Sequence, residues 1–180
     1  MLHKRCKNNN KQLQKLNNNL YLKRKLSDSL STFKSLHFGS ICRVTNSHRY
    51  RATVGIGGNL GDVKRRFEHL FNYLKKDKQV SLVRTSLILK NPPFGFKDQD
   101  DFFNSIIVLN TNMQPVAFLA YLMRLEKKFG RKRSFANAPR TLDLDIIFFD
   151  NRVVNLNKLK IPHLEWFKRE SVLIPLMDTK

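Results

Sequence analysis

The chain has 180 residues, of which 41% are hydrophobic, and 34 Lys and Arg against 14 Asp and Glu give a formal net charge of +20. This length suits one domain with an extension, and the hydrophobic content is enough for a buried core. No apolar stretch is long enough to cross a membrane, and we expect no secretory signal. Two cysteines without a CxxC motif argue against a disulfide framework or a zinc site and favour a reducing cytoplasm.

The first 49 residues differ in composition from the rest of the chain. Residues 1–50 contain eleven Lys and Arg and a single acid, Asp28, together with polar runs such as KNNNKQLQK. We therefore expect residues 1–49 to be a basic extension, disordered or weakly helical, that can be deleted without loss of folding or activity. Contact with RNA, a membrane or a partner is one open explanation of this segment, and a translation start assigned too far upstream is another.

The pattern of residues 50–180 is that of a folded domain. A strand is predicted at 51–58, followed by Asp62 as a helix N-cap and by apolar residues at helical spacing to about Lys76. The same patterns then predict a strand at 79–89, a Pro- and Gly-rich loop, a strand at 102–110, a helix from Pro115 to Gly130 and a strand over the LDLDIIFF stretch. This order predicts the α+β class. Specifically, it predicts a ferredoxin-like β-α-β-β-α-β domain, an antiparallel sheet with helices packed on it as a three-layer α/β/α arrangement.

The stretch PRTLDLDIIFF, residues 139–149, places two aspartates in an otherwise apolar strand. Because side chains alternate along a strand, Asp143 and Asp145 point to the same side, where two carboxylates repel each other. A cation should therefore lie between them. Arginine partners on a solvated face would satisfy this, and so would divalent metal bound together with substrate phosphates.

Four further features are predicted to gather at the same end of the sheet. They are a glycine turn at 55–62, the NPPFG loop with Phe102 and Asn104, a cationic loop with Arg131, Lys132, Arg133 and Arg140, and His163 with Arg169. Prolines, a ring and an amide suit a flat heterocycle with polar edges. Arginines match phosphate oxygens, and arginines beside paired carboxylates are the groups that phosphoryl transfer needs. Each feature alone also fits an ordinary turn, loop or solvated face.

Taken together, the motifs resemble those of the 6-hydroxymethyl-7,8-dihydropterin pyrophosphokinases of the folate pathway. They are G-x-N-L-G-D, P-P-x-G…D-Q…F-x-N, E-x-x-x-G-R-x-R, P-R-T-L-D-L-D-I and P-H, in this order between about residues 51 and 177. The resemblance implies transfer of the terminal diphosphate of ATP to the hydroxymethyl group of the pterin, giving AMP. It also implies ATP as co-substrate, two Mg²⁺ ions, a cytoplasmic monomer and no specific nucleic-acid partner.

The resemblance also implies roles for individual residues. Asp143 and Asp145 would hold the two Mg²⁺ ions, and Arg131 and Arg140 would steady the transferring group. The implied ATP-binding residues are Glu126, Arg131, Arg133, Ile146, Lys158, His163 and Arg169. The implied pterin-binding residues are Gly57, Pro92, Pro93, Phe94, Gly95, Phe102 and Asn104.

Four positions depart from the family pattern. Gly58 stands where serine is frequent, Asn91 replaces a threonine, Ala138 replaces a glycine, and Ser171 stands where an aromatic ring commonly stacks on the pterin. The metal and triphosphate residues are intact, whereas the pterin side is loosened. Two other classes stay open: an inactive relative kept as a scaffold, and a nucleic-acid-binding module. The carboxylate pair argues against the second, because it would repel phosphate.

Overall fold

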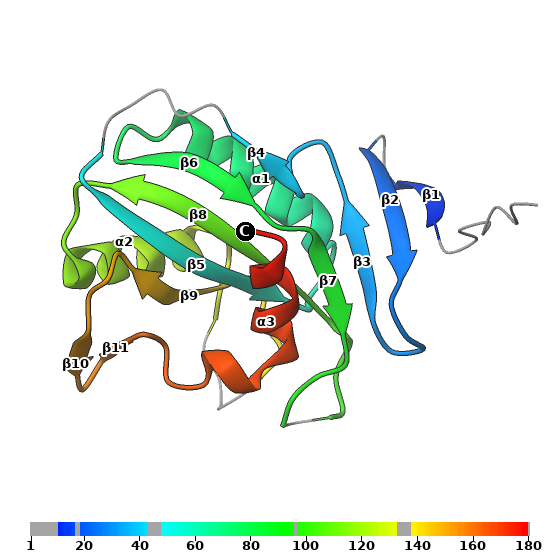
Figure 1. Ribbon diagram of the computed structural model, residues 1–180. Coiled ribbons are helices and arrows are strands. Elements are labelled where there is room, and N and C mark those ends of the chain that lie inside the picture. The colour runs from blue at the N-terminus through cyan, green and yellow to red at the C-terminus, as the bar shows by residue number, and fades with distance from the viewer. Residues whose placement is uncertain (1–10, 17–18, 43–47, 96, 133–137, 180) are drawn as a thin grey trace, which may run out of the picture.

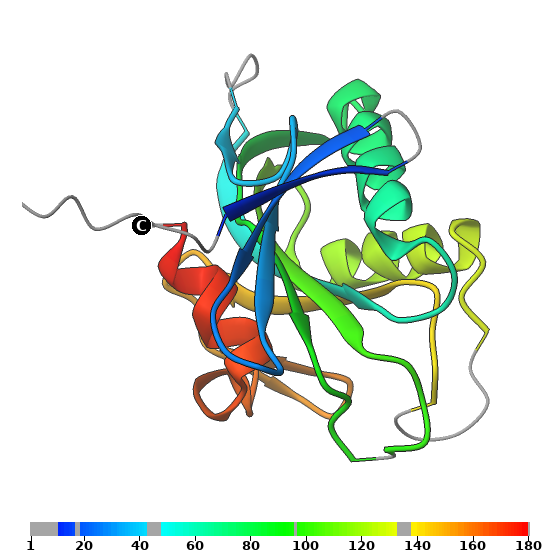
Figure 2. The ribbon, with the colours of Figure 1, turned by 90° about the vertical axis from the view of Figure 1, so that its right-hand side faces the viewer.

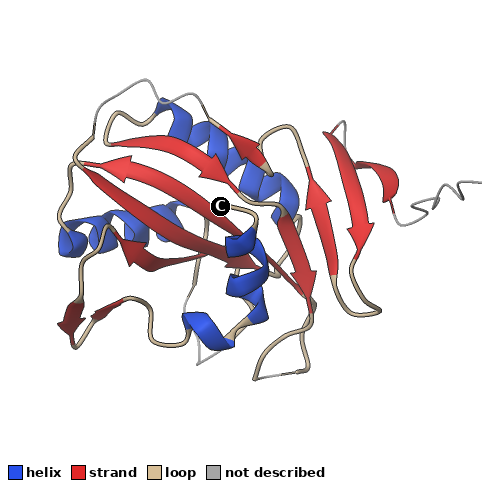
Figure 3. Cartoon of the chain, in the orientation of Figure 1, coloured by secondary structure: helices blue, strands red, loops and turns tan. Residues whose placement is uncertain are grey.

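The computed structural model describes residues 11–16, 19–42, 48–95, 97–132 and 138–179 (Figure 1). Within these residues nine antiparallel strands form one sheet, and two further strands form a small hairpin. Helices α1 (Val63–Lys76) and α2 (Pro115–Lys128) cover one face, and α3 (Glu170–Met177) lies on the other (Figure 2). The expected α+β class is confirmed, and Figure 3 shows the red strands between the blue helices.

The centre of the sheet is built from strands that the sequence predicted. Strand β5 (Tyr50–Gly58) lies between β8 (Phe102–Thr111) and β9 (Asp143–Phe149), antiparallel to both. Strands β6 (Val80–Thr85) and β7 (Ile88–Asn91) pair with successive parts of β8. The order across the central sheet is therefore β9-β5-β8-β6/β7.

The two long helices cover this sheet through apolar stripes. Helix α1 begins after Asp62, whose carboxylate accepts a hydrogen bond from the backbone N–H of Arg65 at 3.0 Å, as the sequence predicted. Its buried apolar residues are Val63, Phe67, Leu70, Phe71 and Leu74. None of the helices in the described parts of the chain is long and apolar enough to span a membrane.

The single strand predicted at 79–89 is divided into β6 and β7 by Ser86 and Leu87. The hydroxyl of Ser86 accepts a hydrogen bond from the backbone N–H of Ile106 at 2.8 Å, and the N–H of Leu87 donates to the carboxylate of Asp178 at 2.8 Å. Side chains thus replace part of the strand pairing, so the strand is interrupted here. Asp178 follows directly after α3, a helix that the sequence pattern did not predict, and the bond fixes the end of α3 against the sheet.

The described part of the extension forms strands, which corrects the expectation of a disordered or weakly helical segment. Strands β1 (Lys11–Leu16), β2 (Asn19–Lys25) and β3 (Ser31–Lys34) continue the sheet beyond β7, and β4 (Ser40–Ile41) pairs with β6. The side chains of Tyr21, Phe33 and Phe38 are buried in the core. Pairing with the open edge of β7 supplies the hydrogen bonds and the buried surface that this segment cannot supply alone.

The last two strands form a hairpin apart from the main sheet. Strands β10 (Val154–Leu156) and β11 (Leu159–Ile161) pair antiparallel, and a short 3-10 helix (Trp166–Lys168) follows. The backbone N–H of His163 donates to the carbonyl of Ile147 on β9 at 3.0 Å. This contact returns the chain to the sheet before it continues into α3, which packs on β7 and β8.

Candidate active site

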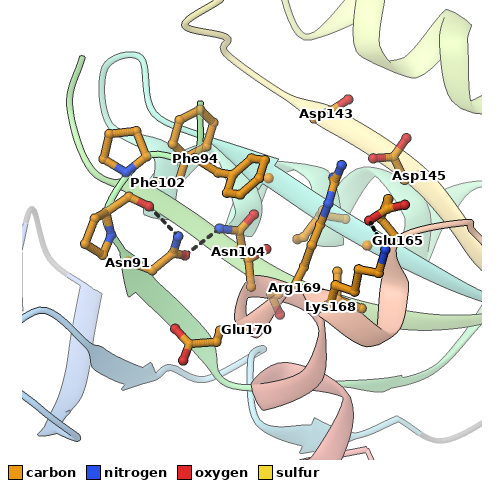
Figure 4. A pocket seen from close by; sticks show the side chains of 18 of the residues that line it. Asn91, Phe94, Phe102, Asn104, Asp143, Asp145, Glu165, Lys168, Arg169 and Glu170 are labelled. Atoms are coloured by element: carbon orange, nitrogen blue, oxygen red, sulfur yellow. Dashed lines mark hydrogen bonds and ion pairs between the residues drawn. The ribbon is translucent and has the colours of Figure 1, made fainter. Parts of the chain in front are cut away.

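A cavity of about 840 Å³ opens on the sheet face that carries α3 (Figure 4). Strands β5, β8 and β9 line it from one side, and the loop after β7 and the segment at the start of α3 line it from the others. The predicted residues that it brings together are Gly57, Pro92, Pro93, Phe94, Phe102, Asn104, Arg140, Asp143, Asp145 and Arg169. The predicted residues outside its lining are Gly95, Glu126, Arg131, Ile146, Lys158 and His163. Arg133 lies outside the described residues.

Asp143 is neutralised by two arginines. Its carboxylate accepts a hydrogen bond from Arg131 and lies 2.9 Å from Nε of Arg140. Arg131 in turn donates to Glu126, whose carboxylate also accepts a hydrogen bond from the backbone N–H of Leu144 at 2.8 Å. Glu126 is only 4% exposed, so it holds Arg131 and strand β9 from beneath the site. A direct contact of Glu126 with the nucleotide stays a prediction.

Asp145 differs from its neighbour in its partners. Its carboxylate opens into the cavity and forms no ion pair with any residue that the structure describes. Poor hydration raises the pKa of this carboxyl, and the negative charge of Asp143 raises that pKa further, while His163, Arg131 and Arg140 act in the opposite direction. A cation bound here would relieve both unfavourable effects.

The donor set at this position suits a magnesium ion. Asp143 and Asp145 supply carboxylate oxygens from one side of β9, and the described residues contain no group of three or more His, Cys, Asp and Glu side chains that could hold a metal ion by themselves. Mg²⁺ is commonly held by one or two carboxylates together with substrate phosphates and water, rather than by a full protein cage. The two aspartates therefore fit Mg²⁺ that arrives with a phosphorylated substrate.

The glycine turn positions Arg140. The side-chain oxygen of Asn59 accepts a hydrogen bond from the backbone N–H of Arg140 at 2.9 Å, and the backbone N–H of Asn59 donates to the Arg140 carbonyl at 3.0 Å. Arg66 on α1 donates to the carbonyl of Thr141 at 3.1 Å. Sequence reasoning did not single out Asn59 or Arg66, although Asn59 is the one amide inside the G-x-N-L-G-D motif.

Gly57 lies on β5 between the two other strands that line the cavity, β8 and β9. It pairs with Asn104 of β8 on one side and with Asp143 of β9 on the other. A Cβ atom at position 57 would lie 2.8 Å from the side-chain oxygen of Asn104. The amide of Asn104 donates to the side-chain oxygen of Asn91 at 2.7 Å, which orients it over the glycine (Figure 4). The lack of a side chain at position 57 therefore leaves room for an oriented amide.

Comparison with known proteins agrees with this geometry. The family model described as 7,8-dihydro-6-hydroxymethylpterin-pyrophosphokinase (HPPK) matches residues 53–180. The chain belongs to this family. The 2-amino-4-hydroxy-6-hydroxymethyldihydropteridine pyrophosphokinase of Campylobacter jejuni is 41% identical over 143 residues, which cover 79% of this chain and 91% of that protein. The Helicobacter pylori protein of the same name is 38% identical over 144 residues, with 79% and 88% coverage.

A more distant relative also carries a folate name. Folic acid synthesis protein FOL1 of Dictyostelium discoideum is 32% identical over 126 residues, which cover 69% of this chain and 19% of that protein. Membership of the HPPK family confirms the resemblance that the motifs indicated. It also confirms the expectation of a pyrophosphokinase, a transferase of folate biosynthesis.

The residues that the family resemblance implies for the pterin include two rings of different exposure in this cavity. Phe102 is 7% exposed, and the guanidinium of Arg140 lies over its ring at 5.1 Å. Phe94 is 80% exposed at the rim. Ser171 lines the cavity from α3 without a ring, and Trp166 packs on Phe148 at 5.0 Å outside the lining. Phe94 is therefore the ring best placed to substitute for the one that Ser171 lacks.

One departure from the HPPK pattern has a steric reason in this chain. A Cβ atom at Gly58 would lie 2.5 Å from the carbonyl oxygen of Thr141, in the segment that carries Arg140. Backbone atoms cannot move aside cheaply, so the glycine fits this close approach better than the serine that is frequent in the family.

Of the residues implied for ATP that the structure describes, only Arg169 lines the cavity. Ile146 is 3% exposed and points into the core, so its side chain does not reach the cavity, which its neighbour Ile147 lines instead. Lys158 lies in the exposed turn between β10 and β11. Arg169 precedes α3, and its side chain extends between Asn104 and Asp145 (Figure 4).

We expect Gly57→Ala to weaken pterin binding about tenfold, because the added methyl group displaces the Asn104 amide and costs about one hydrogen bond. ATP affinity should change little, since the added methyl group would lie 3.9 Å from the Cβ of Asp143, an ordinary van der Waals contact. Titration of each substrate separately, with the melting temperature as a check on folding, measures both effects. A pterin affinity equal to that of the wild type would contradict this role of Gly57.

Proposed function

We propose that this protein transfers diphosphate from ATP to the hydroxymethyl group of 6-hydroxymethyl-7,8-dihydropterin within this cavity, and that its core has the ferredoxin-like order. The observation that carries the proposal is the pair of carboxylates on one face of β9. One is paired with arginines, and the other forms no ion pair within the described residues. The same cavity contains the Asn104 amide, which Asn91 orients, together with the buried ring of Phe102 and the exposed ring of Phe94.

In the proposed reaction the hydroxyl oxygen of the pterin attacks the β-phosphorus of ATP. A P–O bond forms there, the bond between the β-phosphorus and the α,β-bridging oxygen breaks, AMP leaves with that electron pair, and the hydroxyl proton is lost. Asp143 and Asp145 would hold two Mg²⁺ ions, which supply positive charge to the triphosphate when bound. Arg140, held by Asn59, presents its guanidinium beside the same carboxylates, where charge develops.

The remaining residues would orient the substrates. Asn91 keeps the Asn104 amide in one orientation, so that amide can satisfy a polar edge of the pterin. Phe102 lies under that end, and Phe94 is free to cover the opposite face of the ring. Arg169 extends into the space between the pterin end and the aspartates, which suits a contact with phosphate oxygens.

The direct test is a product assay with the full-length protein, ATP, Mg²⁺ and the hydroxymethyl pterin. AMP and the pterin diphosphate should appear together in equal amounts. Release of ADP would indicate transfer of a single phosphoryl group and would overturn the proposal. Absence of any turnover would support the inactive-scaffold alternative.

We expect Arg140→Ala to lower kcat about a hundredfold while the Kd for ATP changes less than about threefold. A cation that acts where charge develops stabilises the transition state more than the bound substrate. Arg124→Ala, which removes an exposed arginine of α2 outside the cavity, is the matched control and should retain kcat. A loss of ATP affinity with kcat spared would assign Arg140 to ground-state binding instead.

A further inference from the structure

The extension reaches the substrate cavity. Ser29 and Leu30, in the turn between β2 and β3, line the same cavity as Asn91, Pro92 and Phe94. The match to the HPPK family begins at residue 53, so these two residues come from outside the part of the chain that the family accounts for. The family match therefore assigns no role to Ser29 and Leu30.

The strand register explains why the turn lies there. In the antiparallel pair of β3 and β7, Ser31 is opposite Lys90 and Thr32 is opposite Leu89. The next position in this register puts Leu30 beside Asn91. Asn91 is the residue that orients the Asn104 amide, so the turn borders the pterin end of the cavity rather than the phosphate end.

The turn has a defined conformation. The backbone N–H groups of Leu26 and Ser27 donate to the carbonyl of Leu30 at 2.9 and 3.2 Å. The N–H of Leu30 donates to the hydroxyl of Ser27 at 3.1 Å. Both backbone polar groups of Leu30 are therefore satisfied within the turn, which holds its half-buried side chain at the cavity wall.

The hairpin behind the turn is firmly attached to the domain. Phe33 is 3% exposed, its ring centroid lies 6.0 Å from that of Phe103 on β8, and the ammonium of Lys64 lies 4.4 Å from the centre of its ring. Farther along, the hydroxyl of Thr85 donates to the carbonyl of His37 at 2.6 Å. Because the hairpin is already ordered in the folded domain, a side chain that it presents to the cavity can contribute to binding with little further loss of conformational entropy.

We propose that the extension is part of the pterin site and that Leu30 contacts the ring of the bound pterin. This inference rests on the proposed function. Ser171 on α3 lines the same cavity with only a small side chain, so an apolar side chain from the extension supplies surface that a flat heterocycle can bury. Leu30 therefore acts on pterin affinity and leaves the phosphate chemistry unchanged.

The test compares two leucines of the same turn in the full-length protein. Leu30→Ala should weaken the Kd for the hydroxymethyl pterin about three- to tenfold, measured by titration with Mg²⁺ and a non-hydrolysable ATP analogue present. The Kd for the analogue should not change. Leu26→Ala is the matched control, because Leu26 is 43% exposed and lies outside the cavity lining. Leu30→Met, which preserves apolar volume, should restore most of the affinity.

The outcomes separate this inference from the proposed function. If the wild-type protein binds no pterin, the proposed function fails, and the inference fails with it. If the wild type binds pterin and Leu30→Ala binds it equally well, the function stands and the inference is wrong. Equal weakening by Leu26→Ala and Leu30→Ala, or an unrestored affinity in Leu30→Met, would assign the effect to the turn as a whole and would also overturn a ring contact by Leu30.

Discussion

Replacement of Asp145 by asparagine should lower kcat about a hundredfold to a thousandfold, with the fold intact. The carboxylate has no ion-pair partner within the described residues and lies beside a second carboxylate, which is the arrangement expected of a group that receives a metal ion with its substrate. Asparagine keeps the shape and removes the charge. Initial rates of AMP formation at saturating ATP, pterin and Mg²⁺ measure the change.

The stability of the Asp145→Asn variant provides an independent measurement. Without Mg²⁺, the substitution removes the repulsion between Asp145 and Asp143, so the melting temperature at neutral pH should equal or exceed that of the wild type. Asp28→Asn, in an exposed turn of the extension, should change neither kcat nor melting temperature appreciably. A variant that kept near-normal kcat would exclude Asp145 as a metal ligand.

Deletion of residues 1–49 should destabilise the domain severely, in contrast to the expectation from composition that this segment is dispensable. It removes the buried side chains of Tyr21, Phe33 and Phe38 and exposes the edge of β7. Each such side chain contributes about 1.5–3 kcal/mol on burial, so the loss approaches the whole stability of a typical domain. Urea denaturation and solubility of the truncated protein measure the effect.

A single substitution gives a sharper form of the same experiment. Phe38 is fully buried and packs on Phe67 and Phe71, with ring centroids 5.8 and 6.4 Å away. Phe38→Ala should lower the free energy of unfolding by about 3–5 kcal/mol. Leu36→Ala, two residues away and 82% exposed, should lie within about 0.5 kcal/mol of the wild type. Equal stabilities of the two variants would show that the extension is not part of the core.

The Asp145 experiments test a catalytic group, and the deletion and Phe38 experiments test whether the extension stabilises the domain. Loss of turnover in Asp145→Asn would place the catalytic chemistry in the part of the chain matched by the HPPK family. Loss of stability in Phe38→Ala would show that the extension contributes to the folded core. The Leu30 experiment then determines whether the extension supports the domain alone or also contacts the pterin.

Local patterns in the sequence were sufficient for the central elements and for the main chemistry. Strand β5, helices α1 and α2, and strands β8 and β9 follow from the spacing of apolar residues and from single capping or turn residues such as Asp62 and Pro115. The common orientation of Asp143 and Asp145 follows from the two-residue period of a strand. The order of the motifs was enough to indicate the family.

Only the tertiary structure decided the roles that depend on distant partners. The hydrogen bonds of Glu126 to Arg131 and to the backbone of Leu144 were not predicted from the sequence. The bonds between Asn59 and Arg140 were not predicted either, because each joins residues far apart in the chain. The composition of the extension is basic and polar and indicated no strands. Its strands depend on the open edge of β7, more than fifty residues away from β3 in the chain. Such pairing leaves no periodic signal of its own, because the hydrogen bonds and buried surface that stabilise it belong to both partners.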